Sequence, residues 1–278
     1  SVLLRIAPDD HVLVMTFHHI LLDGWSLGIL VRDLTNAYQD VSPKPGNASG
    51  DAEVEASEFD PNPLETRYAD YVAWQQQNDF AIDLEYWSDQ LKGIPPFLEL
   101  PGDKSRPAEQ DFSGATIHFR ITKHELDGIR QLGGDKGTTL FMTLLAAFVV
   151  LIYRYSGATD FAVGTPVANR SRAEFESILG LFVNTVVLRN ELDGNPSFDE
   201  LLNQVRTTVL EAFEHQDLPF EQVVDAVGAE RSRAASPLFQ VLFTLQNAPI
   251  GRIQIPGLEW TPYPVEAGTS KFDISLAL

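Results

Sequence analysis

The chain has 278 residues, of which 44% are hydrophobic and 21% are charged, a balance typical of globular proteins. It contains no cysteine, which excludes disulfides, thiolate metal sites and cysteine nucleophiles. With 39 acidic and 20 basic residues its formal net charge is −19, and a surface this acidic repels the phosphate backbone of nucleic acids. No apolar run reaches the length of a membrane span and residues 1–6 are too short for a signal sequence, so we expect a cytoplasmic protein that binds neither nucleic acid nor membrane.

The first part of the chain predicts a strand, a helix, a loop and a second helix. Residues 11–17 (HVLVMTF) form a short apolar run typical of a buried strand. Apolar side chains at helical spacing after Gly24 predict a helix that reaches Tyr38. Residues 41–63, rich in proline, glycine and acids, predict a loop, and residues 68–91 predict one helix.

A proline-rich stretch, residues 93–107, is the best linker in the chain. We therefore place a lobe boundary there, with residues 1–100 in a first lobe and residues 101–278 in a second. Strands alternating with helices predict an α/β fold with layered sheets. The elements expected in the second part are a strand at 115–121, a helix with a Thr122–Glu125 capping box, a buried helix at 139–155, strands at 161–167 and 182–188, a helix from Ser197 to His215 that begins with a second capping box, and strands at 239–245, 258–263 and 272–278.

Two adjacent histidines, His18 and His19, follow the first predicted strand and precede Asp23 and Gly24. Neighbouring side chains on an extended chain point in opposite directions, so only one histidine can face a given cleft. A histidine held in one orientation suits a general base or an acceptor for an attacking group, and a carboxylate before a glycine can fix the local turn. The alternatives are two hydrogen-bonded core histidines or a metal site, although adjacent histidines do not converge readily on a metal ion.

The stretch at 18–26 (HHILLDGWS) resembles the HHxxxDG motif of chloramphenicol acetyltransferase and of the condensation domains of nonribosomal peptide synthetases. The chain is identified as a member of the condensation-domain family because four further blocks follow in the family's order. These blocks are YADYVAW at 68–74, GLFVNT at 180–185 with Arg189 after it, HQDLPFE at 215–221 and SPLFQ at 236–240. The last block departs from the pattern, with Ser232, Ala234 and Ala235 in place of the usual Asp, Ser and Arg.

The resemblance implies a two-lobed, chloramphenicol-acetyltransferase-like fold with layered α/β sandwiches, mixed sheets and an active site in a tunnel between the lobes. The implied activity is that of an amide-bond-forming acyltransferase of antibiotic and other secondary-metabolite biosynthesis, of the subtype that takes an L-configured donor. The acceptor amine attacks a donor thioester, and phosphopantetheine arms of two carrier-protein domains deliver both substrates, beside an adenylation domain of the same megasynthase. Neither a cofactor nor a metal ion is expected to bind the chain directly.

The family's first two blocks are not found before the histidine motif. We therefore expect a domain truncated at both ends, with an incomplete first lobe, and we leave open whether this fragment is active by itself. We also expect Asp23 to lack its arginine partner, because the resemblance implies that this arginine comes from the absent stretch.

The resemblance also assigns roles around the motif. His19 faces the tunnel as a base or a positioning group for the acceptor amine, and His18 is turned into the lobe. Asp23 orders the loop through an ion pair, and Gly24 lets the backbone approach the substrate closely.

Three more residues are predicted to support the active site. Trp25 and Ser26 open the following helix, whose first amides suit a developing oxyanion, although Trp25 also suits core packing. Asn184 lies in an apolar strand and must bond a partner. It lies either beside the histidine loop across the tunnel or in a structural hydrogen bond between strands.

Two other functions stay open at this point. One is a noncatalytic condensation-like module that recruits partner enzymes, which is expected to lose the histidine motif that is intact here. The other is a stand-alone acyltransferase that uses a soluble thioester.

Overall fold

The computed structural model describes residues 1–41, 66–103, 105–229, 232–246, 253–255, 257–265 and 268–278. All but the first residue of the loop expected at 41–63 lies outside these residues. The chain divides into two compact units, each built from three segments. Unit 1 comprises Ser1–Asn78, Arg170–Val183 and Ala248–Val265, and unit 2 comprises Asp79–Asn169, Asn184–Asn247 and Glu266–Leu278.

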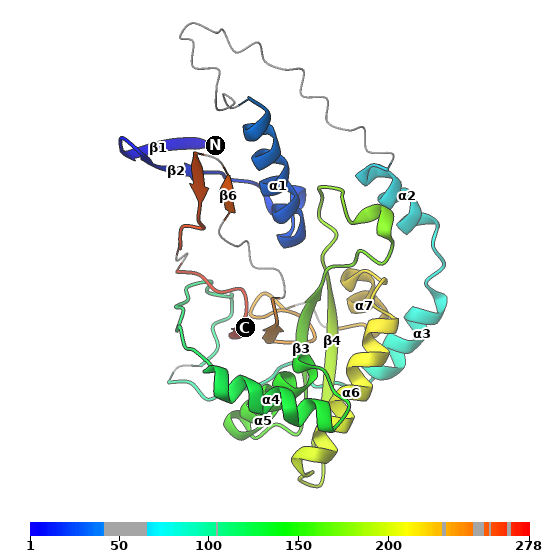
Figure 1. Ribbon diagram of the computed structural model, residues 1–278. Helices are drawn as coiled ribbons and strands as arrows, with labels where there is room; N and C mark the ends of the chain where they lie inside the picture. The colour runs from blue at the N-terminus through cyan, green and yellow to red at the C-terminus, as the bar shows by residue number, and fades with distance from the viewer. Residues whose placement is uncertain (42–65, 104, 230–231, 247–252, 256, 266–267) are drawn as a thin grey trace, which may run out of the picture. The chain divides into compact units, whose positions relative to one another are not determined.

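Unit 1 contains helices and two small antiparallel sheets (Figure 1). One sheet pairs β1 (Val2–Ala7) with β2 (Asp10–Val14), and the other pairs β6 (Ile253–Ile255) with β7 (Leu258–Trp260). The helices of unit 1 are the 3-10 turn η1 (His19–Leu21), α1 (Gly24–Val41), α2 (Tyr68–Gln77) and the 3-10 turn η2 (Ala173–Phe175).

The strand expected at 11–17 is shorter than predicted and is not buried. Strand β2 is partly buried at Val12 and Leu13, whereas Val14 is 42% exposed. In the part of the chain that the structure describes, its sheet has only two strands, so the apolar side chains are not enclosed between layers. The expectation of a helix after Gly24 is confirmed by α1.

Unit 2 is built on a four-stranded mixed sheet. The strand order is β4-β3-β5-β8, in which β3 pairs antiparallel with β4, while the β3–β5 and β5–β8 pairs are parallel. This sheet, with helices packed around it, confirms the predicted α/β class. Its strands are β3 (Asp160–Val167), β4 (Asn184–Glu191), β5 (Val241–Thr244) and β8 (Ile274–Ala277), and the helices of unit 2 are α3 (Ala81–Gln90), α4 (Lys123–Asp135), α5 (Leu140–Ser156), α6 (Phe198–Glu214) and α7 (Phe220–Val227).

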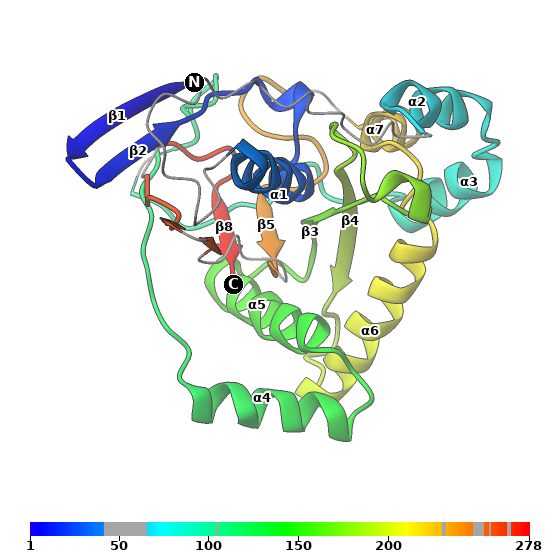
Figure 2. The same cartoon turned by 45° about the horizontal axis from the view of Figure 1, so that its top comes forward.

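The core of unit 2 lies between the sheet and its helices. Figure 2 shows α5 between α4 and the sheet, with α6 packed beside α5. Val149 of α5 and Val163 of β3 are completely buried, as is Leu202 of α6. Both predicted capping boxes are present at the starts of α4 and α6. Helix α7 and strand β6 have no counterpart among the predicted elements.

The single helix expected at 68–91 is two helices in the structure. The chain leaves the helical conformation at Asn78, whose ψ is 136°, and Asp79 accepts a hydrogen bond from the amide of Ala81 to begin α3. The apolar residues of 68–91 are therefore divided between the two units, with Tyr71 buried in unit 1 and Trp87 buried in unit 2. Because apolar residues recur at helical spacing through both segments, the sequence pattern does not show the break between the two helices.

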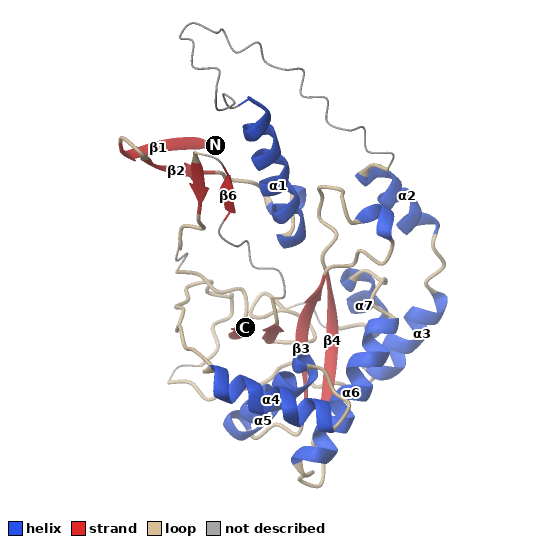
Figure 3. Cartoon of the chain, viewed as in Figure 1, coloured by secondary structure: helices blue, strands red, loops and turns tan. Residues whose placement is uncertain are grey.

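The strand expected at 115–121 does not form. From residue 93 to residue 103 and from residue 105 to residue 122 the chain is loop, with an isolated bridge between Ser113 and Thr269 (Figure 3). No strand among the described residues runs beside 115–121, and Ile117 and Phe119 are 87% and 61% exposed.

The proline-rich stretch at 93–107 packs within unit 2, where the Leu98 amide donates to Gln240 at 2.6 Å. The lobe boundary near residue 100 stays a prediction. The first division between the compact units lies between Asn78 and Asp79.

Among the described residues no single helix has the length and apolar character that crossing a membrane requires. Helices α4 and α5 would meet that test only as a pair bent by 104°, and only by length and composition.

Candidate active site

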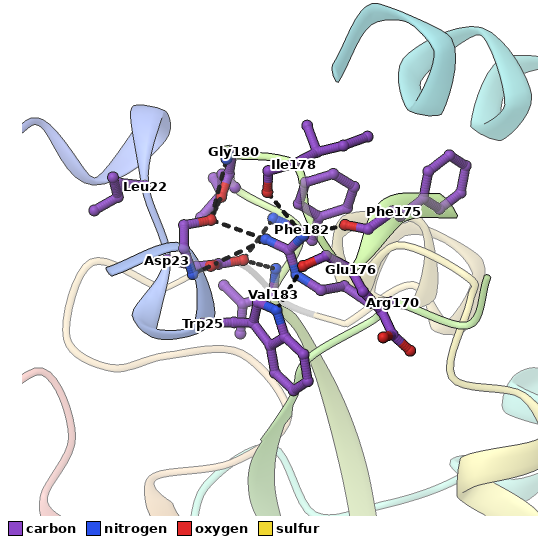
Figure 4. A network of polar contacts seen from close by, with 12 residues as sticks. Leu22, Asp23, Trp25, Arg170, Phe175, Glu176, Ile178, Gly180, Phe182 and Val183 are labelled. Atoms are coloured by element: carbon purple, nitrogen blue, oxygen red, sulfur yellow. Dashed lines mark hydrogen bonds and ion pairs between the residues drawn. The ribbon is translucent and has the colours of Figure 1, made fainter. Parts of the chain in front are cut away.

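The carboxylate of Asp23 is the centre of a hydrogen-bond network in unit 1 (Figure 4). Its Oδ1 accepts the Ser26 amide at 2.7 Å, which begins α1. Its Oδ2 accepts the amides of Phe182 and Val183 at 2.9 and 3.3 Å. Asp23 is only 4% exposed, so a side chain on the motif loop is fixed to a segment about 160 residues further along the chain.

Arg170 completes this network and corrects a sequence-based expectation. Its Nη2 lies 3.4 Å from Asp23 Oδ1, and the two side chains are 2% and 3% exposed. The expectation that Asp23 lacks an arginine partner is therefore wrong. The partner lies 147 residues after Asp23, just beyond β3, and no periodicity or motif marked it in the sequence.

Arg170 also donates to the Ser26 hydroxyl at 2.8 Å, and further contacts hold the loop that precedes β4. Its guanidinium donates to the carbonyl oxygens of Phe175 and Ile178, the latter at 2.9 Å. The same group lies 3.9 Å from the centre of the Phe182 ring, a cation–π contact. Arg170 therefore satisfies backbone carbonyls, a ring and a carboxylate at once.

The pKa of Asp23 shows that this carboxylate is a structural anion. Burial alone raises the pKa of Asp23, but the hydrogen bonds from the Ser26 and Phe182 amides and the charge of Arg170 outweigh burial and leave it below the ordinary value. Burial also lowers the pKa of Arg170, against the opposing effect of Asp23. Since both oxygens of Asp23 already accept hydrogen bonds, this group is poorly suited to carry a proton during a reaction.

Ser26 joins the motif loop to Gly180. The Ser26 hydroxyl donates to the Gly180 carbonyl at 2.8 Å and accepts the Gly180 amide at 3.1 Å, and the side chain is completely buried. The Asp23 amide donates to the same carbonyl at 3.2 Å. Because the Ser26 amide is already bonded to Asp23, it is not free for an oxyanion in this arrangement.

The two motif histidines use their Nδ1 atoms in opposite ways. Nδ1 of His18 accepts the Ile20 amide at 3.2 Å and caps η1, so this nitrogen carries a lone pair. Nδ1 of His19 lies 2.9 Å from the carbonyl oxygen of Leu22, which can only accept, so this nitrogen carries the proton. In the neutral imidazole of His19, Nε2 then holds the lone pair, and it bonds no described residue. The ring is exposed, so Nε2 is open to a substrate.

Gly24 and Trp25 form the first turn of α1. A Cβ placed on Gly24 would meet nothing within 4 Å, so the fold itself does not require glycine there. Trp25 is 45% exposed, and its indole nitrogen donates to the Glu176 carbonyl at 2.9 Å. The alternative of core packing for Trp25 is therefore wrong, because one edge is anchored and the ring remains accessible.

Asn184 begins β4 in unit 2 and has all of its near partners there. Its Nδ2 donates to the carbonyls of Gln216 and Leu218 at 2.8 and 2.7 Å, and its Oδ1 accepts the Phe220 amide at 3.0 Å. These partners lie in the connection between α6 and α7 and at the first residue of α7, so these side-chain bonds of Asn184 do not join two strands. A role for Asn184 beside the histidine loop stays a prediction.

Among the described residues, no cluster of three or more His, Asp or Glu side chains could hold a metal ion. What unit 1 offers is a motif loop on which both His18 and His19 are exposed and which a buried ion pair keeps in place. His18 is not buried, in contrast to the expectation that it is turned into the lobe. The family model of the condensation domain matches residues 1–278. The chain belongs to the condensation-domain family.

Relatives with similar sequences are peptide synthetases. The chain is 43% identical over 280 residues to one component of the linear gramicidin synthase of Brevibacillus parabrevis and 41% identical over 281 residues to a chondramide synthase of Chondromyces crocatus. These matches take in 99% of this chain but only 4% and 7% of those proteins. The chain thus spans a small part of the length of its relatives.

Solved structures share the fold. The X-domain from teicoplanin biosynthesis superposes with a TM-score of 0.83 at 24% identity, over 99% of this chain and 61% of that one. A four-domain nonribosomal peptide synthetase bound to AMP and glycine gives a TM-score of 0.76 at 27% identity, over 94% of this chain and 20% of that one.

Proposed function

We propose that this condensation domain forms a peptide bond between two carrier-bound substrates. The acceptor amine attacks the carbonyl carbon of the donor thioester, a C–N bond forms, and the C–S bond breaks to release a thiol. The observation that carries the proposal is the hydrogen bond between Nδ1 of His19 and the Leu22 carbonyl, because it leaves Nε2 as an exposed acceptor on a fixed loop.

His19 acts on the amine in this proposal. As the C–N bond forms, Nε2 of His19 accepts a proton from the nitrogen, and the proton then goes to the departing sulfur. A general base contributes about 10²–10⁴-fold to such a step. If the amine arrives unprotonated, Nε2 instead orients it by accepting a hydrogen bond, and correct orientation alone can contribute as much.

Asp23 and Arg170 keep His19 in place without touching the substrate. The carbonyl that fixes the His19 tautomer belongs to Leu22, the residue before Asp23. Any movement of the Asp23 backbone therefore moves the hydrogen-bond partner of His19. This accounts for a buried ion pair beside an exposed histidine.

The partners in this proposal are donor and acceptor carrier-protein domains, whose phosphopantetheine arms bring the substrates, and a neighbouring adenylation domain. The donor is expected to be L-configured and the compartment to be the cytoplasm. Relatives that are synthetases many times longer than this chain support a multidomain setting.

The test compares asparagine at the two motif positions, in the synthase module that contains the domain. At each position the amide can keep the hydrogen bond of Nδ1, to Leu22 from position 19 and to Ile20 from position 18, while Nε2 is lost. The readout is the product on the acceptor arm, measured by mass spectrometry with loaded carriers. We expect His19→Asn to lose at least about 10²-fold in rate, His18→Asn to lose much less, and His124→Asn, at an exposed position of α4, to match the wild type.

A loss of less than about tenfold for His19→Asn, below the usual contribution of a base, would remove His19 from its central role. No product from folded wild-type protein that still binds its carriers would favour a recruiting module. Activity on a coenzyme A thioester without any carrier would favour a stand-alone acyltransferase.

A further inference from the structure

The peptide from Gly180 to Phe182 is held from one side by the motif loop. Asp23 accepts the Phe182 amide, and Ser26 exchanges two hydrogen bonds with Gly180 (Figure 4). These contacts fix where Asp23 lies. The position of Asp23 therefore depends on how firmly the Gly180–Phe182 peptide is itself held.

Tyr68, the first residue of α2, holds the same peptide by different atoms. Its hydroxyl donates to the Leu181 carbonyl at 2.7 Å. Its ring lies so close to Gly180 that a Cβ there would come within 2.2 Å of the ring. The ring also meets that of Phe182 edge to face, with 5.1 Å between centroids.

The electrostatic setting keeps the phenol as a hydrogen-bond donor. Burial raises the pKa of Tyr68, and the negative charge of Asp23 raises it further, against the smaller opposing effect of Arg170. These effects favour the neutral phenol, which keeps its proton for the bond to Leu181. The side chain contacts the network but does not belong to the ion pair.

We propose that Tyr68 is a positioning residue for His19. Its hydroxyl and ring fix the Gly180–Leu181 peptide, that peptide fixes Asp23, and Leu22 beside Asp23 fixes the Nδ1 proton of His19. This inference rests on the proposed function for its effect on rate, but not for its effect on the histidine. Tyr68 is half-buried and bonds a backbone carbonyl of the network.

The variant that isolates the contact is Tyr68→Phe, which keeps the ring against Gly180 and removes only the hydroxyl. We expect kcat to fall about 2- to 10-fold, the equivalent of one net hydrogen bond, with KM for both loaded carriers unchanged. The matched control is Tyr155→Phe, which removes the hydroxyl of a residue that is 67% exposed on α5, and it is expected to match the wild type.

A second readout does not depend on activity. In ¹⁵N-histidine-labelled protein, the ring nitrogens of His19 report its tautomer, and Tyr68→Phe is expected to shift them toward a mixture while those of His124 stay unchanged. Coupling supplies a third readout. Because Ser26 and Tyr68 hold one peptide, the loss caused by Tyr68→Phe is expected to shrink in a Ser26→Ala background.

Unchanged His19 signals in Tyr68→Phe would overturn the proposal. So would a fall in activity that only follows the folded fraction, or one that simply adds to the loss from Ser26→Ala. If His19→Asn retains full activity while Tyr68→Phe still shifts the His19 signals, the proposed function fails and the positioning link stands. The two ideas are thus separable.

Discussion

The two units differ in the interactions that stabilise each of them internally. Unit 2 has a large apolar core in which helices enclose a mixed sheet. Unit 1 has a small buried apolar cluster, made of Tyr71, Phe175, Ile178 and Phe182, and its motif loop is fixed by hydrogen bonds to Asp23. Apolar packing is not directional, whereas hydrogen bonds are. Unit 1, whose motif loop carries His18 and His19, therefore relies on polar contacts to fix the geometry of that loop.

One arginine–aspartate pair from each unit can be compared, and these two pairs differ in burial. In unit 1 the Arg170 and Asp23 side chains are 2% and 3% exposed and 3.4 Å apart. In unit 2 the Arg189 and Asp160 side chains are 12% and 27% exposed and 2.7 Å apart. The shorter pair is the one that water can still reach. The distance within an ion pair thus does not by itself indicate how much stability is lost when the pair is broken, because that loss rises with burial.

The largest effect is expected from Asp23→Asn set against Asp160→Asn. Removing one partner of a buried pair leaves an uncompensated charge and costs about 3–5 kcal/mol, whereas a partly exposed pair contributes about 0–1 kcal/mol. Hydrogen exchange of the Phe182 and Val183 amides, beside that of β3 amides, measures the two units separately. Equal losses from the two substitutions would mean that burial does not separate the pairs.

The same carboxylate gives a pH dependence with a definite sign. The pKa of Asp23 is lower in the folded protein than its ordinary value of 3.8. Such a group stabilises the fold above its unfolded pKa, and that contribution is lost as the pH falls through the folded pKa. Protection of the Phe182 amide should therefore fall as acid is added below about pH 4, and Asp23→Asn should flatten this dependence. A parallel pH profile in the variant would assign the effect to another group.

A smaller effect is expected from alanine at two glycines that lie against aromatic rings. A Cβ on Gly164 of β3 would lie 2.3 Å from the ring of Phe239, which is 2% exposed, and a Cβ on Gly180 would lie 2.2 Å from the ring of Tyr68. Overpacking costs about 1–3 kcal/mol, and we place Gly164→Ala at the upper end because Phe239 cannot move aside.

Gly180→Ala should cost less stability in urea denaturation yet more activity, since the displaced ring is the one that holds the motif network. If Gly164→Ala lost more peptide-forming activity than Gly180→Ala at equal folded fraction, the proposed difference between the two units would not hold.

The smallest effect is expected from Tyr86→Phe in unit 2. Whereas Tyr68→Phe is expected to lower kcat, Tyr86→Phe is expected to leave stability unchanged or to raise it. The Tyr86 hydroxyl is buried and has no hydrogen-bond partner among the described residues, and burial raises its pKa, with further raising by Glu211 and Glu214. The ring stacks on His215 at 4.1 Å, a contact that phenylalanine keeps. We expect no loss of stability, or a gain of up to about 1 kcal/mol, in thermal unfolding. A clear loss would reveal a partner for this hydroxyl.

Local signals in the sequence predicted much of unit 2. The capping boxes at Thr122 and Ser197 were found because both partners lie within four residues, and the apolar run of α5 is unambiguous. The strand expected at 115–121 failed because alternation cannot show whether a neighbouring strand exists.

In the site, His18, His19 and Asp23 were identified from a contiguous motif, whereas Arg170 and Tyr68 were not. Their contacts are set by the fold, and the charge partner of Asp23 cannot be chosen among 20 basic residues by spacing alone.

The bond between Asp23 and the Phe182 amide spans 159 residues, and this separation governs when the loop can become ordered. Closing a flexible loop of that length costs about 4.5 kcal/mol in chain entropy, plus a constant. On the ribosome, Asp23 is made long before Arg170, Phe182 and Val183, so its contacts with them cannot all form until residue 183 has emerged. The orientation of His19 is thus set only after 160 residues beyond Asp23 have been made.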